Sequence, residues 1–180
     1  MGTISIKDKT FTVSIPESEI QKEVKRVASE INRDLKDKEP LFLSVLNGSF
    51  MFAADLMRHI QIPSQISFVK LASYQGTSST GTVSELVGLN EDIEGRTIVI
   101  VEDIVDTGLT MVRLLETLRA RRPKEIRIAS LLVKPDKLKV DLHIDYVAMH
   151  IPNDFIVGYG LDYDGYGRNY RDIYTVTEGE

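Results

Sequence analysis

The sequence predicts an α/β fold with a mainly parallel, twisted sheet and helices on both faces. Short apolar runs rich in β-branched residues alternate with amphipathic helical patterns along the 180 residues. We see no internal repeat and no linker. Right-handed crossovers bring the carboxyl ends of parallel strands to one edge of a sheet, and we expect the functional site there.

The first half of the chain alternates strand and helix. Apolar residues recur at helical spacing from Ile20 to Leu35, which predicts a helix over 17–35. A buried strand is expected over 41–46, because this run is continuously apolar. Asn47-Gly48-Ser49 interrupts it, and a second helix is expected over 50–60.

The middle of the chain contains a polar interruption between two strands. Weak alternation predicts strands over 65–72 and 82–89. Between them, SYQGTSSTG at 73–81 is small, polar and punctuated by glycine, so we expect a mobile surface loop.

The second half repeats the alternation. We expect a strand at 98–101, a helix at 109–121 closed by Pro123, and apolar strands at 125–133 and 146–151. The C-terminal third is rich in Gly, Tyr and Asp, and we expect it to be irregular. At the N-terminus, Ile4-Ser5-Ile6 predicts an extended first strand.

Composition limits the possible classes of protein. The length favours a single domain spanning residues 1–180. A net charge of −5 gives no electrostatic case for nucleic acid or an anionic membrane, and with no cysteine there are no disulfides and no cysteine-ligated metal. No apolar run approaches a membrane span or a signal peptide, so we expect a cytoplasmic protein.

The stretch TIVIVEDIVDTGLTM at 97–111 carries the most information. Its apolar run ends in two carboxylates, Glu102 and Asp103, and a small-residue loop follows before the next helix. Gly108 lets the backbone come close to a bound anion, and the free N–H groups at the start of a helix suit a phosphate. Carboxylates suit sugar hydroxyls or a hydrated divalent cation. Together these features describe a ribose 5-phosphate site; the alternative is a buried strand followed by a solvated acidic turn.

This stretch resembles the ribose-phosphate motif of type I phosphoribosyltransferases. The form VEDIVDTGLT is closest to the hypoxanthine-guanine branch, which has Glu-Asp as its acidic pair and an Asp, here Asp106, opening the phosphate loop. Adenine and orotate enzymes usually carry Asp-Asp and lack that second Asp. The resemblance implies that a 6-oxopurine and 5-phosphoribosyl diphosphate react, with Mg²⁺ as cofactor, to give a nucleoside monophosphate and pyrophosphate.

The resemblance also implies roles for the residues of the motif. Asp106 would be the catalytic general base, and Glu102 and Asp103, with Asp162, would bind the metal. The ribose-phosphate site would comprise Glu102, Asp103, Asp106, Thr107, Gly108, Leu109 and Thr110.

A pyrophosphate site is implied by two further segments. Leu46, Asn47 and Gly48 match the loop whose backbone N–H groups bind pyrophosphate, and Arg168 matches an arginine that contacts it. Family members usually have Lys or Arg where this chain has Asn47, so the loop carries one positive charge fewer. Without the resemblance, Asn-Gly is a common turn.

A lid is implied by Ser73 and Tyr74, which open the polar loop. In the family this pair lies on a flexible segment that closes over the reacting sugar and excludes water. The alternative is a surface loop with no role.

The purine site is implied by Lys134 and the segment 151–168. Lys134 would donate to the exocyclic oxygen of a 6-oxopurine, because an ammonium donates and cannot accept. Phe155 would stack on the base, the backbone of Ile156 would read the ring edge, and Asp162 would lie near the base. The termini would thus form a small, irregular hood over the purine. Alternatively, Lys134 ends a strand at solvent, Phe155 and Ile156 are core residues, and Asp162 is a solvated turn.

Rival functions remain at this stage. A regulator that senses phosphoribosyl diphosphate would use the same fold, although the chain has neither spare length for a DNA-binding domain nor a basic charge. A sister transferase for xanthine is not distinguished, while the absence of G-x-x-x-x-G-K-[ST] excludes a Walker-type hydrolase. The expected partners are small-molecule substrates and further copies of the chain, as a homodimer or homotetramer.

Overall fold

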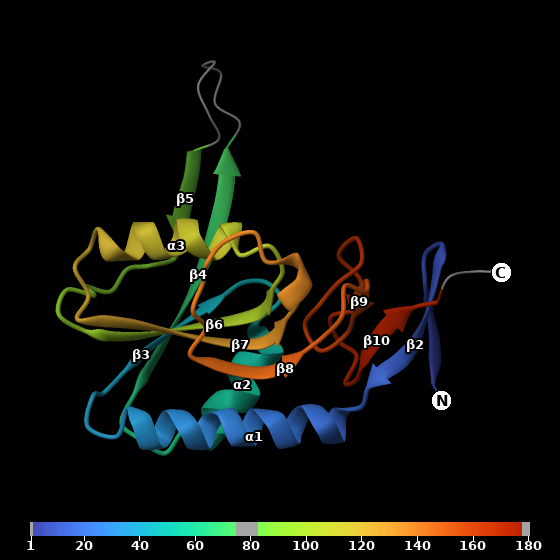
Figure 1. The fold of residues 1–180 in the computed structure, drawn as a ribbon, viewed down its shortest axis with the longest axis horizontal. Coiled ribbons are helices and arrows are strands. Elements are labelled where there is room, and N and C mark those ends of the chain that lie inside the picture. Colours follow the sequence, from blue (N-terminus) through green and yellow to red (C-terminus); the bar gives the residue numbers. More distant parts are fainter. Residues whose placement is uncertain (1, 75–82, 178–180) are drawn as a thin grey trace.

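A six-stranded sheet forms the centre of the computed structural model, which describes residues 2–74 and 83–177 (Figure 1). The strand order is β5-β4-β3-β6-β7-β8, and every neighbouring pair is parallel except β4 and β5. The expected α/β class is therefore confirmed. The strands are β3 (Leu41–Val45), β4 (Gln65–Tyr74), β5 (Val83–Val87), β6 (Thr97–Val105), β7 (Glu125–Val133) and β8 (Tyr146–His150).

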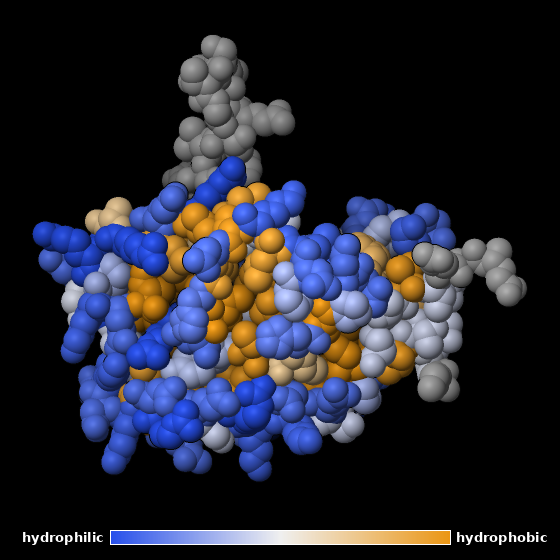
Figure 2. Space-filling model, in the orientation of Figure 1, coloured by the Kyte–Doolittle hydropathy of each residue, from blue (hydrophilic) through white to orange (hydrophobic). Residues whose placement is uncertain are grey.

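Helices cover both faces of this sheet, as expected. Helices α1 (Glu17–Asp34) and α2 (Phe50–His59) lie on one face, and α3 (Leu109–Arg119) lies on the other (Figure 1). Successive side chains of a strand point to opposite faces of the sheet: Val99 packs with α1 and α2, whereas Ile100 packs with α3. Charged side chains cover the outer side of α1 along the lower edge of Figure 2, which is typical of an amphipathic helix.

The connections diverge between β3 and β6. From β3 the chain crosses through α2 to β4 on one side, and from β6 it crosses through α3 to β7 on the other side. Because β3 and β6 are hydrogen-bonded neighbours, their carboxyl ends flank the point where the strand order reverses. Ligands of open α/β sheets bind in the crevice at such a point.

A second, antiparallel sheet joins the two ends of the chain beside the main sheet (Figure 1). Its order is β1-β2-β10-β9, and we call this sheet with its connecting loops (residues 2–15 and 152–177) the hood. It shares the α1/α2 core through Ile156 and Ile173. The hood contains more regular structure than the irregular segment we expected. Its strands are β1 (Thr3–Ile6), β2 (Lys9–Ile15), β9 (Ile156–Val157) and β10 (Ile173–Val176), and the pairing of β2 with β10 joins the two ends of the chain.

Two strands extend past their expected ends. β6 continues through Val105 because its pairing with β7 persists through Val105↔Val133, so the acidic pair lies inside a strand. β4 continues through Tyr74, and Ser73 and Tyr74 pair with β5 instead of opening the loop. The remainder of that predicted mobile loop, residues 75–81, lies outside the described residues.

No helix within residues 2–74 and 83–177 has both the length and the apolar character needed to cross a membrane.

Candidate active site

The loop after β3 meets the end of β6. Gly48 lies so close to Asp103 that an added Cβ at Gly48 would overlap the Asp103 carboxylate. The loop is held to the sheet by the Leu46 N–H, which donates to the Val69 carbonyl at 2.8 Å, and the Leu46–Asn47 peptide is cis. The Asn-Gly sequence is therefore more than a surface turn, because it brings backbone against the acidic pair.

Glu102 is buried, Asp103 is half-buried, and both carboxylates accept backbone hydrogen bonds. Glu102 is 9% exposed, and its Oε1 accepts the Asp103 N–H at 3.0 Å. Asp103 Oδ1 accepts the Ile104 N–H at 2.7 Å. Burial, together with the negative charge of Asp103, raises the pKa of Glu102 well above its usual range. This arrangement contradicts the solvated acidic turn for Glu102 and favours a bound cation or hydroxyl donors at this point.

The donor set fits a magnesium ion that keeps waters and substrate oxygens as ligands. Such an ion needs only one or two protein carboxylates, which Glu102 and Asp103 supply at adjacent positions. In the parts of the chain that the structure describes, no three His, Cys, Asp or Glu side chains gather into a closed metal cage.

The phosphate loop precedes α3 directly. Gly108 begins the helix with φ of 82°, a left-handed conformation that favours glycine, and an added Cβ would lie 2.6 Å from Val140 Cγ2. Thr107 is held on both sides, since its carbonyl accepts the Lys139 N–H at 3.0 Å and its Oγ1 accepts the Leu109 N–H at 3.4 Å. A small cavity of about 90 Å³ lies here, lined by Glu102, Ile104, Val105, Asp106, Thr107, Gly108, Thr110 and Met111.

Asp106 lies beside two lysines. Lys134 is only 7% exposed, and its Nζ lies 4.0 Å from Asp106 Oδ2. The sequence reading of Lys134 as a strand end at solvent is therefore wrong. Lys137 Nζ lies 3.3 Å from Asp106 Oδ1. Sequence reasoning missed Lys137, which the 3₁₀ turn Pro135–Lys137 turns back toward Asp106; Pro135 directly after Lys134 was the available signal.

The expected purine residues lie in the hood. Phe155 is 44% exposed, and its ring meets the Tyr163 ring edge-on at 5.6 Å between centroids. Ile156 has a buried side chain, so only its backbone is available to a ligand. Asp162 is engaged within the hood, because its Oδ1 lies 2.9 Å from Arg168 Nη2. The side chains of the expected lid pair, Ser73 and Tyr74, fall outside the described residues.

The hood also reaches the loop after β3. An added Cβ at Gly160 would overlap the Gly48 carbonyl oxygen, and Arg168 Nη1 donates to the Gly160 carbonyl at 2.7 Å. The structure thus places the candidate pyrophosphate loop between the acidic pair and the segment held by Arg168.

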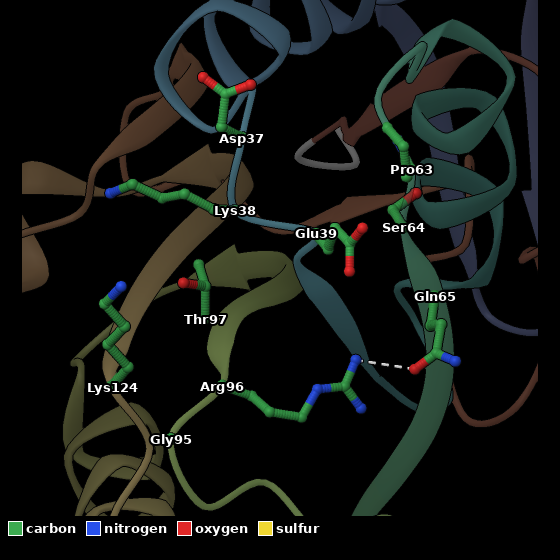
Figure 3. Close-up of a pocket in the computed structure, with 10 residues that line it drawn as sticks. All are labelled: Asp37, Lys38, Glu39, Pro63, Ser64, Gln65, Gly95, Arg96, Thr97 and Lys124. Atoms are coloured by element: carbon green, nitrogen blue, oxygen red, sulfur yellow. Dashed lines mark hydrogen bonds between the residues drawn. The ribbon is translucent and has the colours of Figure 1, made fainter.

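A larger cavity of about 550 Å³ lies at the opposite edge of the sheet, at the amino ends of β3, β4, β6 and β7 (Figure 3). Its charges are mixed and partly paired: Lys38 Nζ lies 2.7 Å from Glu125 Oε1, and Arg96 donates to Gln65 Oε1 at 2.7 Å. It includes neither the acidic pair nor the phosphate loop. Strand polarity, rather than cavity size, identifies the site.

Comparison with known proteins decides the family. Residues 16–164 match the family described as phosphoribosyl transferase domain. The chain belongs to the phosphoribosyltransferase family, in its hypoxanthine-guanine branch. This membership makes it an enzyme and confirms the resemblance drawn from residues 97–111.

Individual phosphoribosyltransferases show how far the similarity extends. The hypoxanthine-guanine phosphoribosyltransferase of Streptococcus pyogenes is 43% identical over 158 residues, covering 87% of this chain and 86% of the relative. The hypoxanthine phosphoribosyltransferase of Salmonella typhimurium is 42% identical over 167 residues, covering 91% and 92%. A crystal structure of a hypoxanthine-guanine phosphoribosyltransferase from Bacillus anthracis superposes with a TM-score of 0.85 at 39% identity, covering 92% of this chain and 98% of the other.

We predict that Glu102→Gln stabilises the ligand-free protein at neutral and alkaline pH. A raised carboxyl pKa means that ionisation opposes folding, so the contribution of Glu102 to stability is fully present below the unfolded pKa, 4.5, and is lost as pH rises through the folded pKa. The amide mimics the protonated acid. Thermal unfolding from about pH 4 to 8 should give melting temperatures that diverge with increasing pH. Glu116→Gln, on the exposed side of α3, is the control; a parallel gain there, or no gain at Glu102, contradicts the prediction.

Proposed function

We propose that the protein is a purine salvage enzyme that converts hypoxanthine, guanine or both, with 5-phosphoribosyl 1-diphosphate, into IMP or GMP and pyrophosphate in the presence of Mg²⁺. The observation that carries the proposal is the meeting of three elements at the switch point between β3 and β6. Gly48 contacts Asp103 on β6, the phosphate loop comes directly after the end of β6, and Asp106 in that loop lies beside Lys134.

The ribose phosphate would bind along the end of β6. Backbone N–H groups from Thr107 to Thr110, at the positive end of α3, would hold the 5-phosphate. Glu102 and Asp103 would accept hydrogen bonds from the ribose hydroxyls and hold hydrated Mg²⁺. Their negative field would favour a sugar that becomes cationic at C1. Bound Mg²⁺ would neutralise the charge of the leaving pyrophosphate.

Pyrophosphate would be held from two sides. Leu46, Asn47 and Gly48 would offer backbone N–H groups, and Arg168 would supply a positive charge. Asp162 now pairs with Arg168, so binding would divide the guanidinium between carboxylate and phosphate. Asp162 would also contribute to binding magnesium near the base.

The base would lie between Lys134 and the hood. Lys134 would donate to the exocyclic oxygen, Phe155 would cover one face of the ring, and the Ile156 backbone would pair with its edge. Asp106 would accept a proton at the five-membered ring of the purine. Lys137 can hold Asp106 when Lys134 turns to the base, since both ammonium groups lie within 4.0 Å of that carboxylate.

A lid would protect the reacting sugar. Ser73 and Tyr74 lie at the end of β4, in the hairpin that projects beyond α3 (Figure 1). Closure of this segment would exclude water, which would otherwise hydrolyse the activated sugar.

The direct test offers hypoxanthine, guanine, xanthine, adenine and uracil separately, with 5-phosphoribosyl diphosphate and Mg²⁺, and follows nucleotide formation. Turnover of 6-oxopurines alone supports the proposal and ranks the three candidates. Absence of turnover with every base, together with binding of the sugar diphosphate, would instead indicate a regulator.

Asp106→Asn should lower turnover roughly 10²–10⁴-fold, because an amide cannot take the proton from the base. Steady-state kinetics measure this loss, and circular dichroism checks that the fold is intact. Asp136→Asn, exposed in the nearby 3₁₀ turn, should retain wild-type turnover. Near wild-type activity in Asp106→Asn would remove Asp106 from the mechanism.

Lys134→Gln should weaken the preference for oxo over amino purines, because an amide both donates and accepts. The ratio of kcat/KM for hypoxanthine and adenine measures this preference. Lys124→Gln, exposed at the opposite edge of the sheet, should leave the ratio unchanged. An unaltered ratio in Lys134→Gln would mean that another group recognises the exocyclic oxygen of the purine.

We also propose that the enzyme is a homodimer or homotetramer. Ile66 and Phe68 are exposed on one face of β4. Val87 on β5 pairs with Lys70 of β4 and is exposed on the same face of the sheet. Burial of this face between copies would remove apolar surface from water. Light scattering should give a multiple of the 20.3 kDa chain mass, and Phe68→Glu should reduce it; a monomeric wild type would refute the proposal.

A further inference from the structure

One tyrosine of the hood is hydrogen-bonded to α2, at an acceptor that α1 also contacts. Tyr159 is 2% exposed, and its hydroxyl donates to Asp55 Oδ2 on α2 at 2.5 Å. The same carboxylate oxygen accepts from Gln21 Nε2 on α1 at 2.7 Å. The hydroxyl thus connects the hood to α1 and α2 through a single acceptor.

The backbone around Tyr159 is unfavourable by itself. Tyr159 has φ of 47°, a left-handed conformation that is rare for a bulky residue, and it lies between Gly158 and Gly160 at φ of 98° and 97°. Such a conformation persists where the surroundings over-determine it. Here the Tyr159 N–H donates to the Tyr170 carbonyl at 2.9 Å while the hydroxyl is held by Asp55.

The next residue touches the candidate pyrophosphate loop. Gly160 packs against the Gly48 carbonyl oxygen without room for a Cβ. Its N–H donates to the Arg168 carbonyl at 3.0 Å, and its own carbonyl accepts from Arg168 Nη1 at 2.7 Å. A shift of Tyr159 would therefore move Gly160 relative to both Gly48 and Arg168.

Helix α2 connects the loop at Gly48 to Asp55. Gly48 immediately precedes its N-cap, Ser49, and Asp55 lies in its second turn. The 159–160 segment therefore makes two contacts with this region, one between Gly160 and Gly48 just before the helix and one between Tyr159 and Asp55 within it. Because a helical turn is rigid, two contacts fix the distance between the loop and Arg168.

We propose that Tyr159 and Asp55 are positioning residues for pyrophosphate: their hydrogen bond holds the Leu46–Gly48 loop and Arg168 at the separation that binds the leaving group. This inference rests on the proposed function, because it assumes pyrophosphate between these groups. Neither side chain would touch substrate. Their effect is on binding geometry, where small displacements change affinity strongly.

The test compares pyrophosphate and base kinetics in Tyr159→Phe, which removes the hydroxyl and keeps the ring. We expect KM for pyrophosphate in the reverse reaction, and KM for phosphoribosyl diphosphate in the forward reaction, to rise roughly tenfold. KM for hypoxanthine should stay within about twofold. Calorimetric titration with magnesium pyrophosphate should show the same weakening without turnover.

Tyr146→Phe is the matched control. Tyr146 is also 2% exposed, and its hydroxyl donates to Asp34 Oδ2 on α1 at 3.2 Å, but it lies on β8 and outside the hood. Its variant should lose stability and keep wild-type KM values. Asp55→Asn keeps an oxygen acceptor and should restore pyrophosphate binding relative to Asp55→Ala.

The outcomes separate this inference from the proposed function. If wild type neither binds pyrophosphate nor forms nucleotide, the proposed function fails, and this inference fails with it. If wild type does both and Tyr159→Phe has an unchanged pyrophosphate KM, the positioning role alone is overturned. An equal rise in Tyr146→Phe also overturns it, because general loosening would then explain the effect.

Discussion

The contact between Gly48 and the carboxylate of Asp103 is the constraint on which the rest of the site depends. It joins the loop after β3 to the last residues of β6, where the crossovers from these two strands leave in opposite directions. A side chain on Gly48 would separate the two. With the contact in place, backbone N–H groups for an anion and carboxylates for a cation or hydroxyls lie next to each other, which is what a magnesium-bound sugar diphosphate requires.

Burial of Glu102 next to Asp103 affects the ionisation of the acidic pair. A carboxylate at 9% exposure beside another carboxylate is unfavourable, so the pKa of Glu102 is raised. A bound cation would reverse that penalty. If the proposed cation binds here, the protein would exchange some stability at the end of β6 for complementarity to positive charge, as is common at functional positions.

The hood adds three groups to the site at the edge of the central sheet. Phe155 offers an aromatic face, Arg168 offers a positive charge, and Gly160 reaches the loop at Gly48. Because Tyr159 fastens this segment to α2, the two halves of the proposed pyrophosphate site are held by one helix. In the proposed site the loop carries the uncharged Asn47, so Arg168 would supply the positive charge on the hood side of pyrophosphate.

The sequence by itself determined the α/β class, the mainly parallel sheet, the helices and strands of that central part, and the motif at 97–111, because these depend on local periodicity and adjacent residues. It did not determine the hood sheet, the Lys137–Asp106 pair or the Tyr159–Asp55 bond. Each of these joins residues distant in sequence or turned together by a local bend, and only the packed chain brings them within hydrogen-bonding distance. The end of β6 shows the same division: in the sequence the apolar run ends before Glu102 and Asp103, while pairing with β7 keeps both in the strand, where Glu102 is buried.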